Sequence, residues 1–229
     1  MVRGFTAISR PHQASRWYTA CDPQRCLVRG TAYRMLKRAI DMLLCLLSLP
    51  LVLPVLGLCA ILIWIDSPGP VFFCQFRTGK DGRRFRMYKL RTMVSNAEAL
   101  KAGCVNLNQL ALPDFKIAHD PRVTHIGRML RRTSLDELPQ ILNVLRGDMS
   151  FVGPRPTSFT PDTYQLWQTA RLAVLPGLTG LWQISGRATL DFDQRVRLDL
   201  EYIQRQCMWL DFQIMLRTCV QLFRGEGAY

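Results

Sequence analysis

The chain has 229 residues, with 30 Lys and Arg against 17 Asp and Glu, and its formal net charge is +13. Such a charge suits an anionic membrane surface, an anionic substrate or nucleic acid. We expect no nucleic acid, because no recognised nucleic-acid-binding signature accompanies the basic residues. The eight cysteines include no C-x-x-C pair and the three histidines lack metal-ligand spacing, which disfavours a disulfide scaffold and a structural zinc site.

The first long feature of the chain is an apolar run that follows a basic N-terminal extension. Residues 1–32 form that extension, and we expect it to be flexible. No charged side chain occurs from residue 42 to residue 65. As one helix the run would be about 36 Å long at about 1.5 Å per residue, enough to cross a hydrocarbon core of about 30 Å. Residues 33–66 are therefore predicted to form a membrane-inserted helix.

Two features of this run favour a re-entrant helix over a spanning one. Pro50 and Pro54 lie inside the run, and each removes a backbone donor and favours a bend. Basic residues flank both ends, at positions 34–38 and 77–91, and such flanks prefer the cytoplasm. A helix that breaks near Pro54 and returns to the same leaflet satisfies both flanks. A spanning helix is the alternative.

The segment after the apolar run has the pattern of a small β-hairpin. An Asp-Ser-Pro-Gly-Pro turn at residues 66–70 ends the run. Residues 71–77 and 84–93 then read as two short strands around a glycine-containing turn at residues 79–82. Residues 94–112 read as a polar helix and loop.

The rest of the sequence is mainly helical in pattern. Apolar residues recur at helical spacing after residue 120, and helices are predicted at residues 161–175, 192–203 and 209–223. The last combines aromatic, aliphatic and basic residues, which is typical of a helix lying flat in a membrane interface, but an ordinary packed helix fits equally well. The expected fold is α+β and mostly helical, with a compact domain at residues 67–224 and a short tail at 225–229.

Asp136 and Glu137 form an adjacent acidic pair with two competing interpretations. The structural one is a helix capping box, because Ser134 and Glu137 match the pattern in which the glutamate reaches back to the serine amide. Acidic residues are common in a first helical turn, since they oppose the positive end of the helix dipole. Viewed alone, the pair would be assigned this structural role.

The surroundings of the pair favour phosphate chemistry instead. Arginines lie close to it in sequence, and glycine-rich turns follow at residues 147–153; the arginines are Arg131, Arg132, Arg146 and Arg155. Arginine lowers the pKa of a nearby carboxyl group and binds phosphate. A carboxylate can attack phosphorus to form an acyl phosphate, so one member of the pair can be a nucleophile while the other binds a cation. Mg²⁺ is the expected ion, because carboxylate and diphosphate oxygens select hard cations.

From about residue 33 to residue 223, the chain closely resembles the monotopic phosphoglycosyl transferases, also called bacterial sugar transferases. The resemblance rests on an ordered series of motifs. They are KRAID at residues 37–41, DSPGPVFF at 66–73, YKLRTM at 88–93, DPRVTHIGRMLRRTSLDELPQ at 120–140, GDMSFVGPRP at 147–156 and PGLTGLWQISGR at 176–187.

This resemblance implies an enzyme that transfers sugar 1-phosphate from a UDP-sugar to undecaprenyl phosphate, or another polyprenyl phosphate, and releases UMP through a covalent aspartyl-phosphosugar intermediate. It implies the first membrane step of exopolysaccharide, capsule or O-antigen assembly. The expected location is the bacterial inner membrane, among its lipids, with the active site of a compact catalytic domain on the cytoplasmic face. Which sugar is transferred, and whether the protein is a homo-oligomer, stay open.

The resemblance also implies residue roles. Asp136 corresponds to the covalent nucleophile, and Glu137 to the residue associated with Mg²⁺, with Asp136 as a second candidate ligand. Phosphate contacts are implied for Arg131 and Arg155, and for Lys89 or Arg91; Arg187, which ends the last motif, is a further candidate. Pro54 aligns with the helix-breaking proline of the family. Two departures are Leu53, where the family often has serine, and the additional Pro50.

Two other functions remain as alternatives. A non-enzymatic membrane adaptor would explain the charge and the apolar helix, but not the carboxylates among arginines. A metal-dependent lipid phosphatase would use similar residues but would release inorganic phosphate instead of a nucleotide.

Overall fold

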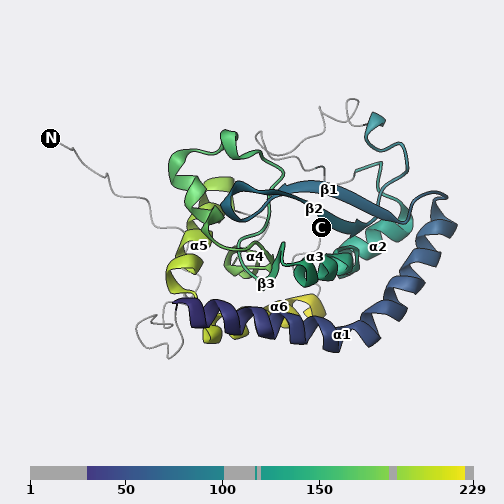
Figure 1. Ribbon diagram of the computed structural model, residues 1–229. Coiled ribbons are helices and arrows are strands. Elements are labelled where there is room, and N and C mark those ends of the chain that lie inside the picture. Colours follow the sequence, from purple (N-terminus) through teal and green to yellow (C-terminus); the bar gives the residue numbers. More distant parts are fainter. Residues whose placement is uncertain (1–29, 101–116, 118–119, 186–189, 225–229) are drawn as a thin grey trace.

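The computed structural model describes residues 30–100, 117, 120–185 and 190–224. The predicted N-terminal extension lies almost wholly outside them, as does Arg187. The described part is mostly helical, with two small sheets (Figure 1). In chain order its elements are α1 (Gly30–Asp66), β1 (Phe72–Thr78), the 3₁₀ turn η3 (Lys80–Gly82), β2 (Arg84–Leu90), α2 (His125–Thr133), the 3₁₀ helix η5 (Leu135–Gln140), α3 (Ile141–Arg146), β3 (Ser150–Val152), the 3₁₀ helices η6 (Pro161–Thr163) and η7 (Leu166–Ala173), β4 (Gly177–Thr179), α4 (Leu181–Ile184), α5 (Phe192–Arg205) and α6 (Met208–Arg224).

The apolar run forms the long helix α1, which is apolar and long enough to cross a membrane. Helical residues continue without interruption through Pro50 and Pro54. Figure 1 nevertheless shows a change of direction about midway along α1, as expected for a helix that contains prolines. The re-entrant path of α1 in lipid stays a prediction.

One face of α1 packs against the rest of the protein along most of its length. In its middle, Cys45 and Val52 join a cluster with Met87 of β2 and Ile141 of α3. Near its end, Cys59 and Ile63 pack against Leu90 and Leu130. The opposite face is apolar but exposed, with Leu47 69% and Leu51 73% exposed. Exposed apolar surface on this scale indicates contact with lipid or another apolar partner.

The start of α1 is held by a buried polar cluster. Asp211 of α6 accepts hydrogen bonds from Tyr33 Oη at 2.7 Å, from Lys37 Nζ at 2.6 Å and from Tyr202 Oη at 2.7 Å. The Asp211 side chain is only 3% exposed. Because a buried carboxylate is strongly destabilising without partners, this three-donor arrangement makes the position of α1 on α6 specific.

Further polar contacts hold both ends of α1 on the same body. Arg38 donates to the last carbonyls of α3, and Asp41 accepts from the Phe151 amide of β3 at 3.2 Å. At the opposite end, Asp66 accepts from the Ile126 amide in the first turn of α2 at 2.9 Å. Basic side chains at a helix C-terminus and acidic ones at an N-terminus are both favoured by the helix dipole.

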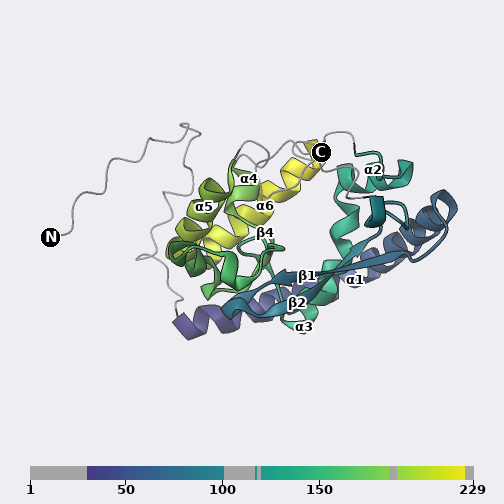
Figure 2. The ribbon, with the colours of Figure 1, turned by 90° about the horizontal axis from the view of Figure 1, so that it is seen from above.

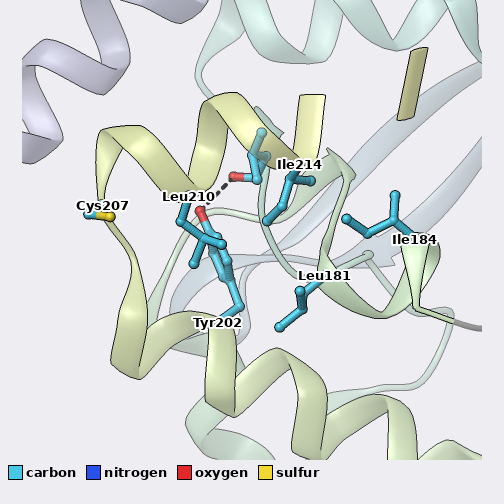
Figure 3. Close-up of a cluster of buried hydrophobic side chains, with 7 residues drawn as sticks. Leu181, Ile184, Tyr202, Cys207, Leu210 and Ile214 are labelled. Carbon is cyan, nitrogen blue, oxygen red and sulfur yellow. Dashed lines mark hydrogen bonds between the residues drawn. The ribbon is translucent and has the colours of Figure 1, made fainter. Parts of the chain in front are cut away.

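The C-terminal helices enclose a separate core. Leu181 and Ile184 of α4 pack with Tyr202 of α5 and with Leu210 and Ile214 of α6 (Figure 3). Seen from above, α4, α5 and α6 lie together at one side of the β1–β2 hairpin (Figure 2). Asp211 of α6 is buried, as are Leu210 and Ile214, while Trp209, Phe212 and Leu216 of the same helix are exposed.

Most predicted elements are confirmed, with local differences. The hairpin pairs Phe72 with Leu90 through Thr78 with Arg84, so its second strand is shorter than predicted. The single helix expected over residues 161–175 is wrong: η6 and η7 are separate 3₁₀ helices, because Tyr164 and Gln165 are extended and Gln165 caps a new start with Gln168. Part of the predicted 94–112 segment lies outside the described residues.

The Asp211 cluster predicts a large effect of one side chain on stability. Asp211→Asn should lower the free energy of unfolding by about 3 kcal/mol, because it removes the negative charge that accepts hydrogen bonds from Lys37 and from two tyrosine hydroxyls. Thermal unfolding in detergent should show a midpoint lower by roughly 6–12 °C. Lys80→Ala is the control, because its 4.0 Å pair with Asp81 is exposed, and it should leave the midpoint unchanged. Equal midpoints for Asp211→Asn and wild type would contradict the assignment.

Candidate active site

Asp136 and Glu137 lie in η5, between α2 and α3 and against β2. The chain reaches η5 through Ser134, whose φ of +58° is unusual for a residue with a side chain. Ser134 makes no side-chain capping hydrogen bond. The capping-box interpretation is therefore wrong, because the Glu137 carboxylate is bound by two cations from distant segments instead of the Ser134 amide.

The Glu137 carboxylate binds side chains from two segments that are distant in sequence, β2 and the loop after β3. Lys89 of β2 donates to Oε1 at 2.9 Å. Arg155, from the loop after β3, donates from Nη1 to Oε2 at 3.2 Å and from Nη2 to Oε1. Burial alone would raise the pKa of Glu137, but Arg155 and Lys89 outweigh it and hold the pKa well below its ordinary value. Glu137 is therefore ionised at neutral pH.

Asp136 has a different environment although it adjoins Glu137. Its residue is 8% exposed, and its nearest cation is Lys89, whose Nζ lies 3.8 Å from Oδ2. Burial raises the pKa of Asp136; Lys89 opposes this increase and the Glu137 charge adds to it. One carboxyl group is thus paired and firmly ionised, and its neighbour is less stabilised as an anion. Such divergent pKa values are typical of functional pairs.

Two nearby side chains position the cations that bind Glu137. The buried amide of Asn143 donates to the Arg86 carbonyl at 2.7 Å and accepts from the Tyr88 amide at 3.1 Å, which places Lys89. Arg171 donates to the Arg155 carbonyl at 2.8 Å. Its own guanidinium lies 2.6 Å from buried Asp199, whose pKa burial raises to about 6 against the opposing charge of Arg171.

The loop that carries Arg155 is held by a tight backbone approach. Strands β3 and β4 pair in parallel, with Ser150 opposite Gly177 and Val152 opposite Thr179. A Cβ at Gly177 would lie 2.1 Å from the Gly153 amide nitrogen, so any side chain there would displace one strand. Gly153 of the GDMSFVGPRP motif and Gly177 of the PGLTGLWQISGR motif therefore allow this close backbone contact.

The predicted arginines are not all brought to the acidic pair. Arg131 donates from Nε to Thr92 at 2.9 Å, and its charge acts on Asp136. Arg91 instead donates to the carbonyls of Ser67 and Pro68, just after α1, and is buried there. Arg91 thus supports the end of α1. Arg187 lies outside the described residues, so its predicted role is untested.

Sequence reasoning missed Asn143, Arg171 and Asp199. Asn143 had a weak signal, because it is one polar residue within the apolar stretch Ile-Leu-Asn-Val-Leu. Arg171 and Asp199 had none, since their 28-residue separation conceals a buried ion pair.

Lysine and arginine beside an acidic pair are chemically suited to bind an anionic, phosphorylated ligand. The bacterial sugar transferase family matches residues 32–225, and this chain belongs to that family. The chain is 48% identical to galactosyl transferase CpsE of Streptococcus agalactiae over 164 residues, which cover 70% of this chain and 36% of CpsE.

Two relatives are covered over most of their length. The exopolysaccharide production protein ExoY of Rhizobium meliloti is 38% identical, with 85% of this chain and 88% of ExoY covered. The UDP-glucose:undecaprenyl-phosphate glucose-1-phosphate transferase of Caulobacter vibrioides is 41% identical, with 84% and 72% covered. By contrast, the chain spans only about two fifths of the length of CpsE and of relatives from Salmonella typhimurium and Erwinia amylovora.

The ion pairs of Glu137 predict a pH-dependent stability. In buffer with a chelator, Glu137→Gln should lower the free energy of unfolding at pH 7 by about 1–3 kcal/mol, because Arg155 and Lys89 lose their charged acceptor. A lowered pKa stabilises the fold above the ordinary value of 4.5, so the difference should shrink as pH falls below that value. Chemical denaturation at pH 7 and pH 4 measures both.

Glu201→Gln is the matched control, because Glu201 pairs with Arg205 within α5 at 3.5 Å and away from the acidic pair. It should behave as wild type at both pH values. If Glu137→Gln has wild-type stability at pH 7, the ion pairs of Glu137 with Arg155 and Lys89 contribute nothing to the stability of the fold.

Proposed function

We propose that this protein transfers a sugar 1-phosphate from a UDP-sugar to undecaprenyl phosphate and releases UMP, as the first membrane step of exopolysaccharide, capsule or O-antigen assembly. The observation that carries the proposal is a buried Asp136 carboxyl group beside a Glu137 that binds Lys89 and Arg155, in a chain of the sugar transferase family. The names of the Caulobacter and Rhizobium relatives supply the substrate pair and the pathway class.

The reaction proceeds in two displacements. An Asp136 oxygen attacks the phosphorus that carries the sugar, the bond from that phosphorus to the bridging oxygen breaks, and UMP leaves with the electron pair. A phosphate oxygen of undecaprenyl phosphate then attacks the aspartyl phosphorus, and the Asp136–phosphorus bond breaks. Each displacement exchanges bonds of similar energy, so the transfer needs little net driving force.

The side chains of the site divide the work. Asp136 suits the nucleophile because, among the described residues, no cation pairs with it as closely as Lys89 pairs with Glu137. Lys89 and Arg155, already fixed by Glu137, offer positive charge where two anionic substrates must meet. Arg131 adds charge at the edge of the site.

A Mg²⁺ ion fits this donor set. Within residues 30–100, 117, 120–185 and 190–224, no group of three acidic, histidine or cysteine side chains gathers. Mg²⁺ is commonly bound by one or two carboxylates together with substrate phosphates and water, so Glu137 and Asp136 would hold it with the donor diphosphate. Bound there, the ion would neutralise charge on the leaving diphosphate oxygens.

The contacts of α1 support a monotopic placement in the membrane. A spanning α1 would put its two ends on opposite faces, but Lys37, Asp41 and Asp66 all contact the same body. We propose that the bend of α1 dips into one leaflet and that both ends stay at the cytoplasmic surface of the inner membrane. Helix α6 lies beside the first half of α1 (Figure 1), and its exposed residues, which include Trp209, would lie in the membrane interface.

The nucleophile assignment predicts the effect of one substitution. Asp136→Asn should reduce UMP release from UDP-sugars by at least about a thousandfold, because the attacking oxygen is lost. The assay uses purified protein, Mg²⁺, undecaprenyl phosphate and a panel of UDP-sugars. Without acceptor, wild type should gain the mass of one sugar phosphate, and Asp136→Asn should not.

Asp136→Asn should unfold at the wild-type temperature or above it, because it removes a buried carboxyl group whose pKa burial raises. Full turnover by Asp136→Asn would refute covalent catalysis. If the wild-type protein releases inorganic phosphate without UMP, the lipid phosphatase is favoured. If the wild-type protein gives no product at all, the adaptor is favoured.

The monotopic placement predicts the accessibility of both flanks of α1. In a cysteine-free variant, Arg34→Cys places a thiol at an exposed position in the first turns of α1, and Arg83→Cys places one at an exposed position after its end. Both should react with a membrane-impermeant maleimide in inside-out vesicles, and neither should react in intact spheroplasts. Reaction of one thiol from each side would establish a spanning helix.

A further inference from the structure

One edge of strand β1 is largely unpaired among the residues that the structure describes. Strand β2 pairs with the opposite edge, and this edge is paired only at its end, where the Thr78 amide donates to the loop after β3. Successive residues of an antiparallel strand point their backbone groups alternately toward the two neighbouring positions, so those of Phe72, Cys74 and Phe76 point away from β2 as Thr78 does. Arg84 donates to the Phe76 carbonyl at 3.3 Å, which leaves a second lone pair on that oxygen.

The same stretch of β1 is apolar and exposed on both faces of the hairpin. Phe72 is 54% exposed, Phe73 48% and Phe76 52%. Cys74 is exposed too. Side chains alternate between the faces of a strand, so Phe73 lies on the face opposite to the other three. Native proteins usually protect a free edge with a charge, a proline or a bulge, and residues 71–76 contain neither a charge nor a proline. Such an edge suits the addition of a further strand.

A strand fits this edge better than lipid does. Lipid would cover the phenylalanine rings, because β1 follows soon after α1 in the sequence. Lipid tails offer no hydrogen-bond donor or acceptor, however, so an edge that faces lipid would leave its backbone groups unsatisfied. An added strand covers the rings and also pairs with the backbone groups.

The edge is complementary to a second copy of itself. In an antiparallel pair centred on Cys74, Phe72 of each copy lies opposite Phe76 of the other, and the residues with outward backbone groups all fall at hydrogen-bonded positions. Aromatic pairs across neighbouring strands stabilise a sheet. The hairpin register places Arg86 beyond Phe76 and Leu90 beyond Phe72, so no two like charges adjoin across this junction.

We propose that β1 pairs antiparallel with β1 of a second copy of this chain, so that the two hairpins form one four-stranded sheet in a homodimer. Each copy uses the same edge, so the dimer is closed and does not grow further. In the proposed monotopic placement, α1 would hold all copies at the same depth, and the two edges would meet by diffusion in the membrane plane. The junction contains neither Asp136 nor Glu137, so the dimer is independent of the proposed function.

The first test removes one backbone donor from the edge. Cys74→Pro deletes the outward amide at the centre of the junction and leaves the pairing of β1 with β2 in place, because edge positions tolerate proline. Sedimentation of the whole protein in detergent should show association weakened by about tenfold or more, because each copy loses a hydrogen bond. Cys74→Ser is the matched control, since it changes the same side chain but keeps the amide, and it should associate as wild type does.

A charged variant serves if Cys74→Pro does not fold. Cys74→Lys changes an exposed side chain and sets two ammonium groups opposite each other in the dimer. It should weaken association as Cys74→Pro does.

A thiol cross-link tests the register. In a variant that retains only Cys74 of the eight cysteines, a short bifunctional thiol reagent should join two chains in membranes, because hydrogen-bonded partners in antiparallel strands lie about 5.5 Å apart at Cα. The control retains only Cys219, which is exposed on α6, and should yield single chains.

Each negative outcome overturns the β1 junction. Wild-type protein that stays monomeric at every concentration would do so, as would equal association of wild type and Cys74→Lys. A protein that dimerises without a cross-link at Cys74 would show that another surface forms the dimer. A protein that dimerises through β1 but releases no UMP would refute the proposed function and leave the junction in place.

Discussion

The pairing of Glu137 with two cations is the interaction on which the candidate site depends. Lys89 comes from the hairpin and Arg155 from the loop after β3, and neither segment is next to η5 in sequence. A carboxylate at this depth is destabilising alone, and so are two cations forced together without it. The charge of Glu137 therefore brings three chain segments to one point. The same interaction leaves Asp136 as the less paired carboxyl group, so the fold itself distinguishes the two members of the pair.

The attachment of α1 relates this site to the lipid surface. Most of the polar contacts at the two ends of α1 reach elements that also support the active site: α2 precedes η5, α3 follows it, and β3 leads to Arg155. The apolar face of α1 packs against the same elements through Cys45 and Cys59. A helix attached in this way cannot change its depth in a membrane without moving the site. In the proposed monotopic placement, the height of Asp136 above the lipid would thus be set by the folded chain.

The sequence predicts the elements better than it predicts their contacts. The apolar helix, the hairpin and α6 follow from local patterns of hydrophobicity and turns, and all three are observed. The capping box was wrong because local spacing cannot register Lys89 and Arg155, which draw the Glu137 carboxylate away from Ser134. Arg91 matched a motif, yet its side chain binds the carbonyls after α1. The supporting pair of Arg171 and Asp199 depends on a long-range contact that no spacing rule reveals.

The different surroundings of the two carboxyl groups explain why they would not exchange roles. An attacking oxygen needs an available lone pair and freedom to approach phosphorus, and both Glu137 oxygens already accept hydrogen bonds from Arg155. Moving Glu137 toward a substrate would break these bonds and leave two cations unpaired, which is destabilising. In the proposed reaction, Asp136 would give up only a 3.8 Å contact with Lys89 to form a covalent bond. Burial also raises the pKa of Asp136, so its carboxylate is the less stabilised of the two anions and the one better suited to attack in the proposed reaction.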